Sequence, residues 1–161
     1  MTTYDAYTRV SNAQAVTGST SIVSASSILL SAASGPGGAR VAHDIGVGAP
    51  LKFRVHVTTT LSASQEMTVQ VVLATDAALT TSVTPIASSV AINTDGLTAG
   101  SEFDVPIPQL SIPVMNGNGD YYIGLRYLFD GSLAAGAVSA WIPLGQSHRL
   151  PKRYAGNYTG P

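Results

Sequence analysis

Residues 44–60 read DIGVGAPLKFRVHVTTT and contain the clearest strand pattern in the chain. From residue 51 to residue 58 apolar and polar side chains alternate, with Leu51, Phe53, Val55 and Val57 on one side. A period of two places one side of a β-strand in a core and the other toward solvent. The glycines and the proline of residues 46–50 favour a bend just before it. We therefore predict a half-buried strand that leaves a tight turn.

The same alternation recurs along the chain, and no helical period of useful length interrupts it. Strands are expected over 20–30, 67–73, 86–92, 103–107, 121–129 and 138–142, with an eighth over either 10–17 or 41–45. Because only residues 62–66 separate the first strand from the next, we expect these two to pair as a hairpin. Pro106 and Pro108 place the 103–107 strand at a sheet edge, whereas 121–129 is expected to be central. This pattern predicts an all-β, antiparallel, jelly-roll-like sandwich of about eight strands with extended N- and C-terminal arms.

The composition indicates one domain that packs against other subunits. A chain of 161 residues fits a single jelly-roll domain, 1–161, divided into an N-terminal arm (1–16), the sandwich (17–145) and a C-terminal tail (146–161). Only 11% of the residues are charged and the net charge is −1, against about 25% charged residues in a typical soluble domain. We expect synthesis in the cytoplasm, since the start of the chain has no apolar segment typical of a signal peptide and no run is long enough to span a membrane.

Chemistry-bearing motifs are missing from the sequence. The chain has no cysteine, no elbow that would activate a serine nucleophile and no phosphate-binding glycine loop. His43, Asp44 and His56 could ligate a metal, but their spacing does not require one, and they fit exposed turn and strand positions better. Glu102 and Asp104 share a strand face as solvated edge charges. We therefore expect no enzymatic activity, no cofactor, no metal and no small-molecule substrate.

The candidate partner-binding residues lie mostly in the terminal segments. Residues 1–130 contain five basic and nine acidic residues, whereas residues 131–161 contain three basic and no acidic ones. Three cations are too few for a strong nucleic-acid footprint, so we interpret the tail as protein-binding, with a disordered end as the alternative. Trp141 points away from Val138 and Ala140, so exposure to a partner and packing in the second sheet are both open. The full set of candidates is Tyr4, Tyr7, Arg9, Trp141, Arg149, Lys152, Arg153, Tyr154 and Tyr158.

Several segments taken in order resemble the jelly-roll capsid cement, or decoration, proteins of tailed bacteriophages. These are VSNAQAVTGST, DIGVGAPLKFRVHV, VQVVLATDAALTTSVTPIA and YYIGLRYLFDGSLAAGAVSAWI. The most specific pieces are Ser11–Thr17, Asp44–Gly48 and the YIGLRY run with its Gly- and Ala-rich return. The resemblance implies a protein on the outer surface of a virion that clamps neighbouring major capsid protein subunits. It further implies a homo-oligomer, with a homodimer favoured and a homotrimer as the other symmetric choice, and no nucleic-acid or membrane partner.

A second reading is a carbohydrate-binding or adhesin-like sandwich carried on a virion. In that reading Trp141 or Tyr122 would serve as the platform on which a sugar ring stacks. A pair of aromatic side chains on one exposed face would favour it.

Overall fold

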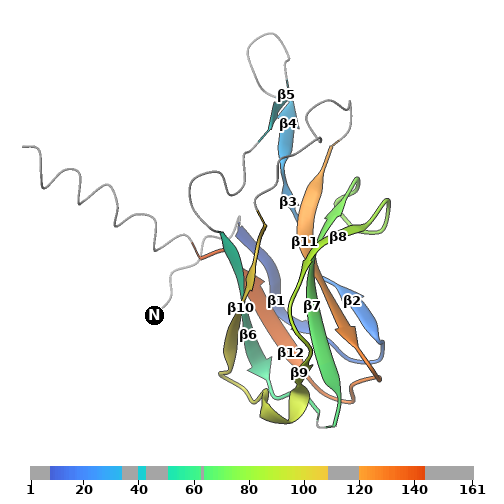
Figure 1. The fold of residues 1–161 in the computed structure, drawn as a ribbon, viewed down its shortest axis with the longest axis vertical. Helices are drawn as coiled ribbons and strands as arrows, with labels where there is room; N and C mark the ends of the chain where they lie inside the picture. Colours follow the sequence, from blue (N-terminus) through green and yellow to red (C-terminus); the bar gives the residue numbers. More distant parts are fainter. Residues whose placement is uncertain (1–7, 34–39, 43–50, 63, 109–119, 144–161) are drawn as a thin grey trace, which may run out of the picture.

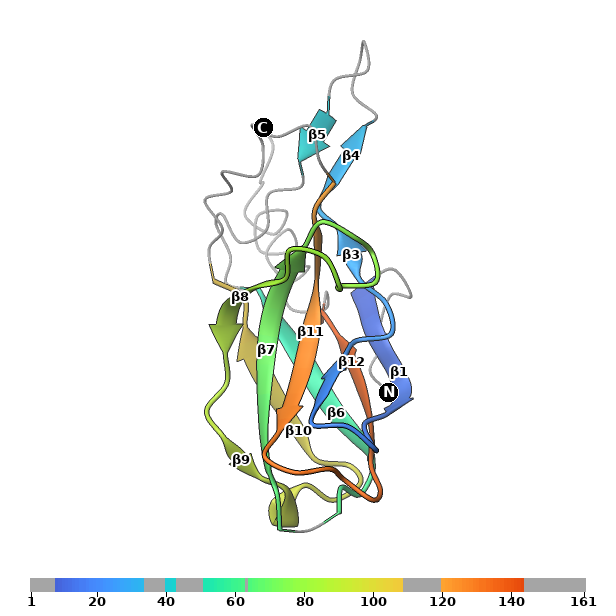
Figure 2. The same ribbon diagram turned by 90° about the vertical axis from the view of Figure 1, so that its right-hand side faces the viewer.

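The computed structural model describes residues 8–33, 40–42, 51–62, 64–108 and 120–143. These residues form antiparallel β-strands with a short 3-10 helix at Thr94–Gly96, and no α-helix occurs among them. The strands build two sheets that stack face to face (Figures 1 and 2). The predicted all-β sandwich is therefore confirmed.

Each of the two stacked sheets has four main strands. Sheet I has the order β1 (Arg9–Ala15), β12 (Ala137–Trp141), β6 (Lys52–Thr59) and β10 (Glu102–Pro106). Sheet II has the order β2 (Ser21–Val23), β11 (Tyr122–Phe129), β7 (Glu66–Ala74) and β8 (Thr84–Ser88). Two short strands extend sheet II, since β3 (Ile28–Leu29) also pairs with β11 and β9 (Ile92–Asn93) also pairs with β7.

The connectivity is that of a jelly roll. If β2 and β3 count as one interrupted strand and β8 and β9 as another, the sandwich has eight strands in chain order. The first then pairs with the last, the second with the seventh, the third with the sixth and the fourth with the fifth, all antiparallel. Such pairing results when one long hairpin is rolled up into two sheets, which is the double Greek-key arrangement of jelly rolls.

One apolar core fills the space between the sheets, and alternate residues of the long strands supply it. Phe53, Val55 and Val57 of β6 are fully buried, while the residues between them are half-buried. Across the core lie further fully buried side chains of β7 and β11, namely Met67, Val69, Val71, Ile123, Leu125 and Tyr127. Burial of each large apolar side chain contributes about 1.5–3 kcal/mol, so the predicted alternation locates the main source of stability.

The predicted hairpin between the strands at 51–57 and 67–73 is wrong. Strand β6 belongs to sheet I and β7 to sheet II, so the connection between them crosses from one sheet to the other. Leu61 in this connection is only 3% exposed and its N–H donates to the Leu97 carbonyl oxygen. Both strands turn their apolar sides to the same core, but from opposite sheets. A short connection between two strands is compatible with such a crossing as well as with a hairpin.

The N-terminal boundary of the sandwich lies earlier than the predicted arm (1–16) implied. Residues 9–15 form β1 at the edge of sheet I, which is the eighth strand expected over 10–17. The other option, 41–45, overlaps β5 (Arg40–Ala42). Among the described strands β5 pairs with β4 (Ser31–Ala33) alone, in a separate ribbon that projects from one end of the sandwich (Figure 1).

A polar network, buried at Tyr127 and Ser11 and half-buried at Gln14, closes the sandwich where the β1 and β2 edges meet. The Tyr127 hydroxyl lies 2.9 Å from Ser11 Oγ, which donates to Gln14 Oε1 at 2.8 Å. The Gln14 amide in turn donates to the Val23 carbonyl oxygen at 2.7 Å and accepts from the Ala25 N–H at 2.8 Å. Complete burial raises the pKa of the Tyr127 hydroxyl, against the opposing effect of its bond to Ser11. These bonds tie the edge strand of sheet I to sheet II.

Candidate interaction surfaces

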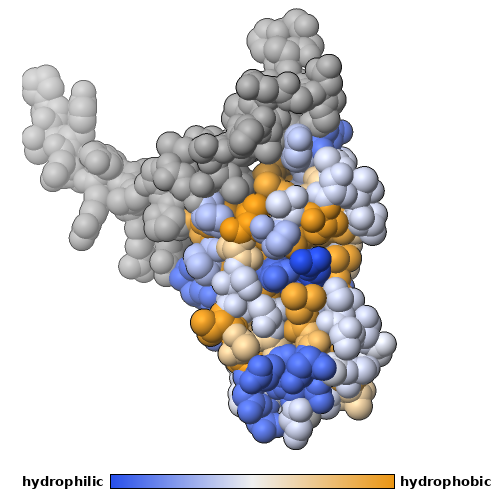
Figure 3. Space-filling model, turned by 45° about the vertical axis from the view of Figure 1, so that its right-hand side comes forward, coloured by the Kyte–Doolittle hydropathy of each residue, from blue (hydrophilic) through white to orange (hydrophobic). Residues whose placement is uncertain are grey.

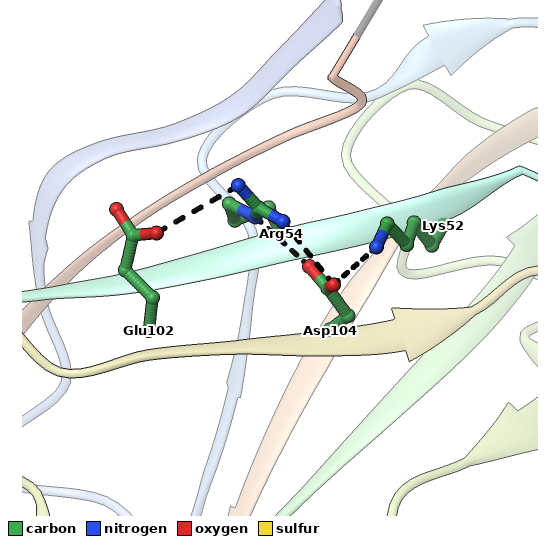
Figure 4. Close-up of polar contacts among 4 residues, drawn as sticks. All are labelled: Lys52, Arg54, Glu102 and Asp104. Atoms are coloured by element: carbon green, nitrogen blue, oxygen red, sulfur yellow. Dashed lines mark hydrogen bonds and ion pairs between the residues drawn. The ribbon is translucent and has the colours of Figure 1, made fainter. Parts of the chain in front are cut away.

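The outward face of sheet I carries a ladder of paired charges. Alternation on β6 turns Lys52 and Arg54 outward, and the register with β10 places Arg54 directly opposite Asp104. The Arg54 guanidinium donates from Nε to Asp104 Oδ1 at 2.9 Å and from Nη2 to Oδ2 at 3.3 Å, and Lys52 Nζ binds the same carboxylate (Figure 4). Glu102 Oε2 lies 3.8 Å from Arg54 Nη1.

This ladder is neutral as a unit, because two cations face two carboxylates. The hydrogen bonds from Arg54, followed by those from Lys52, lower the pKa of the Asp104 carboxyl despite its partial burial. The same contact raises the pKa of the Arg54 guanidinium. Asp104 is thereby held in its ionised form, which suits an edge charge that discourages strand pairing rather than a general acid. The predicted solvated edge charges are thus engaged with cations of the neighbouring strand.

Trp141 lies on the outward face of sheet I, as the alternation predicted, but it is not open to solvent. Its register partner is the outward Arg54, whereas the adjacent Ala140 pairs with Val55 of the core. The side chain is nevertheless only 4% exposed, and its ring lies 6.4 Å from the His56 ring with an interplanar angle of 60°. The expected exposure to a partner is therefore not seen, and neither is the alternative of packing in the second sheet.

The outward face of sheet II is divided into a covered and an open half. The loop after β7 folds back so that Leu79 packs on Val72 and Ala74, with Tyr122 half-buried beside them. The other half, toward the β9 end, stays open, and blue and orange side chains lie next to each other over it in Figure 3. Arg126 lies there, donating from Nε and Nη2 to Gln70 Oε1 at 3.0 and 2.6 Å.

Most of the sequence-predicted candidates lie outside the described residues. These are Tyr4, Tyr7, Arg149, Lys152, Arg153, Tyr154 and Tyr158, together with His43 and Asp44 of the considered metal group. Arg9 lies on β1, where its guanidinium donates to Asn12 Oδ1 at 3.1 Å. No group of three or more potential metal ligands occurs in the part of the chain that the structure describes, and no helix there is long and apolar enough to cross a membrane.

Two surface features were missed by the sequence reasoning. The Lys52 and Arg54 contacts to Asp104 require β6 to pair with β10, and nothing in the sequence specified that neighbour. The contact of Arg126 with its neutral partner Gln70 depends on the pairing of β11 with β7. The paired alternation of the two strands could have suggested this second contact.

The chain was compared with known families and with curated proteins. The sequence model of one family, Bbp16, matches residues 10–142, a range that runs from β1 to the residue after β12 and so covers the whole sandwich. No curated protein matches the chain. The family name specifies no activity, substrate or partner.

Proposed function

This chain belongs to the Bbp16 family, and we propose that it is a capsid decoration protein of a tailed bacteriophage. In this role it binds the outer surface of the capsid and clamps neighbouring major capsid protein subunits. It works as a homo-oligomer, with a homodimer favoured over a homotrimer, and has no catalytic step. It is made in the host cytoplasm and ends on the virion.

The strand order is the observation that carries the proposal. The sequence resembles capsid decoration proteins over nearly its whole length, and that resemblance implies a jelly roll. The described residues have the jelly-roll order in both sheets. Because one fold serves many functions, the topology supports the proposal only together with the resemblance.

The charge distribution is consistent with a protein that functions within an assembly of many copies. Only 11% of the residues are charged, and on sheet I the outward charges of Lys52, Arg54, Glu102 and Asp104 face one another. Such a surface exerts little long-range repulsion on identical copies packed nearby. Each copy that contacts two capsid subunits raises the free energy needed to separate them, and repetition over a shell multiplies modest affinities.

The carbohydrate-binding reading receives less support. Jelly rolls also occur in lectins, but a stacking platform needs an open aromatic ring. Trp141 is 4% exposed and Tyr122 is half-buried against the loop that covers sheet II. None of the aromatic side chains within the described ranges falls among the exposed residues.

Cosedimentation tests the proposal directly. Shells assembled from the major capsid protein encoded alongside this chain are mixed with the purified protein and pelleted. We expect saturable binding, with a fixed number of copies per capsid subunit, and a higher melting temperature of the loaded shells. Absence of binding, combined with a specific signal on a glycan array, would reverse the order of the two candidates.

A further inference from the structure

The open half of the outward face of sheet II has a charge pattern that is complementary to itself. Three levels follow one another along β11 and β7, two residues apart on each strand. Arg126 lies opposite Gln70, then Leu128 opposite Thr68, and then Asp130 beside Glu66, where the Glu66 N–H donates to Asp130 Oδ1 at 2.8 Å. The face therefore runs from a cation through an apolar level to two carboxylates.

Neither end of this pattern is neutralised within the described structure. Arg126 is half-buried, yet both of its hydrogen bonds go to the neutral amide oxygen of Gln70 and no described carboxylate forms an ion pair with it. Glu66 is exposed and likewise has no ion pair among the described residues. This differs from sheet I, where the outward Lys52 and Arg54 of β6 are matched by Glu102 and Asp104 of β10.

We propose that this half-face is a contact between two copies of the chain, related by a two-fold axis that lies in the interface and crosses the strands at the level of Leu128. Such an axis reverses the strand direction, so Arg126 of one copy faces the Asp130 and Glu66 level of the other, and Leu128 faces its own counterpart. An axis parallel to the strands would instead place Arg126 against its own level. Since an isologous contact uses the same patch twice, each dimer gains two such charge contacts around an apolar centre.

The size of the patch sets the expected strength. Strands about 4.8 Å apart with a rise of about 3.3 Å per residue give a patch roughly 13 Å along the two strands and roughly 10 Å across them. That area is small beside a standard interface, so the contact belongs to the weak, transient class. The inference deepens the self-association included in the proposed function, because it names the surface. A weak pair contact is sufficient for copies that a capsid already holds side by side.

Analytical ultracentrifugation of the full-length protein without capsids tests the contact separately from capsid binding. We expect the wild type to show a concentration-dependent monomer–dimer equilibrium that weakens at raised salt. Glu66→Lys should raise the dimer Kd about tenfold, which corresponds to about 1.4 kcal/mol. Glu102→Lys, which makes the same charge change on sheet I, is the matched control and should leave the Kd within about twofold, a small shift beside that tenfold change.

The triple reversal Arg126→Glu, Glu66→Lys and Asp130→Lys provides the deciding arm, because it inverts every charge of the contact in both copies at once. We expect it to recover most of the dimer lost in Glu66→Lys, with circular dichroism verifying that each variant is folded. The inference is overturned if the wild type stays monomeric, if the two lysine variants weaken the dimer equally, or if the triple reversal dimerises no better than Glu66→Lys. A failed contact that leaves capsid cosedimentation intact would overturn this surface and not the proposed function.

Discussion

Replacing Gly124 by alanine should destabilise the protein, because the loop after β7 is packed directly onto this position. A Cβ atom built there would collide with Leu79 Cδ1 and would lie only 2.8 Å from Ser24 Oγ. Ser24 can yield little, since its Oγ accepts from the Leu125 N–H at 3.1 Å and donates to the Ser26 carbonyl oxygen at 2.8 Å. Overpacking of this kind costs about 1–3 kcal/mol.

Thermal and urea denaturation followed by circular dichroism measure this cost. For a chain of this length about 2 kcal/mol corresponds to a fall of roughly 4–8 °C in Tm. Gly96→Ala is the matched control, because a Cβ at Gly96 meets nothing within 4 Å. We expect that control to be neutral or slightly stabilising, since alanine reduces the entropy of the unfolded chain.

A double-mutant cycle identifies the collision partner. Leu79→Ala alone removes a fully buried side chain and should cost about 2–5 kcal/mol. In that background the additional cost of Gly124→Ala should shrink by about 1–2 kcal/mol, leaving only the conflict with Ser24. If Gly124→Ala were as harmless as Gly96→Ala, or if its cost were unchanged without the leucine, the loop would not pack on sheet II as described.

Three further predictions concern the core, the charges and the tail. Ser11→Ala should lower the free energy of unfolding by about 1–3 kcal/mol, because it leaves the buried Tyr127 hydroxyl without its partner, whereas Tyr127→Phe should cost about 1 kcal/mol. Chemical denaturation of the two variants measures both costs. A larger cost for Tyr127→Phe would contradict the hydrogen-bond network. Asp104 has a lowered pKa through Arg54, so its contribution to stability is present above the ordinary value of 3.8 and is lost as the pH falls through the folded value. The denaturation midpoint of Asp104→Asn should therefore change less than that of the wild type between about pH 5 and pH 2; equal changes would mean that the ladder has no part in acid sensitivity. Deletion of Leu150–Pro161 should leave Tm nearly unchanged while weakening retention on capsids in the cosedimentation assay; early unfolding with unchanged binding by the folded fraction would show that the tail is a structural part of its own domain.

The face of each long strand was predictable from the sequence, but its neighbours were not. Alternation identifies which residues of β6 and β11 enter the core, because a pleated strand has a period of two. It does not specify the sheet in which a strand lies. Consecutive strands are neighbours in only about two-thirds of cases, and the step from Thr59 to Glu66 is one of the exceptions, since it crosses between sheets.

The surface features were predictable only in part for the same reason. Outward positions of Arg54, Asp104 and Trp141 follow from alternation, but the ion pairs depend on the β6 and β10 register. The alternation along β12 indicates the face of the sheet on which Trp141 lies, but not whether other residues cover that face. The burial of Trp141 could therefore not be inferred from the sequence. Strand ends were similarly hard to assign in the 86–92 segment, where β8 and β9 are separate strands and Val90 between them is 81% exposed.

Electron cryomicroscopy of phage particles produced from the genome that encodes this chain tests the proposed role as a capsid decoration protein. We expect density for a jelly-roll domain on the outside of the head, with sheets in the orders β1-β12-β6-β10 and β2-β11-β7-β8, straddling the boundary between neighbouring major capsid protein subunits at every equivalent position. A head surface without this domain, or the same domain found only on a tail fibre or a receptor-binding tip, would contradict it.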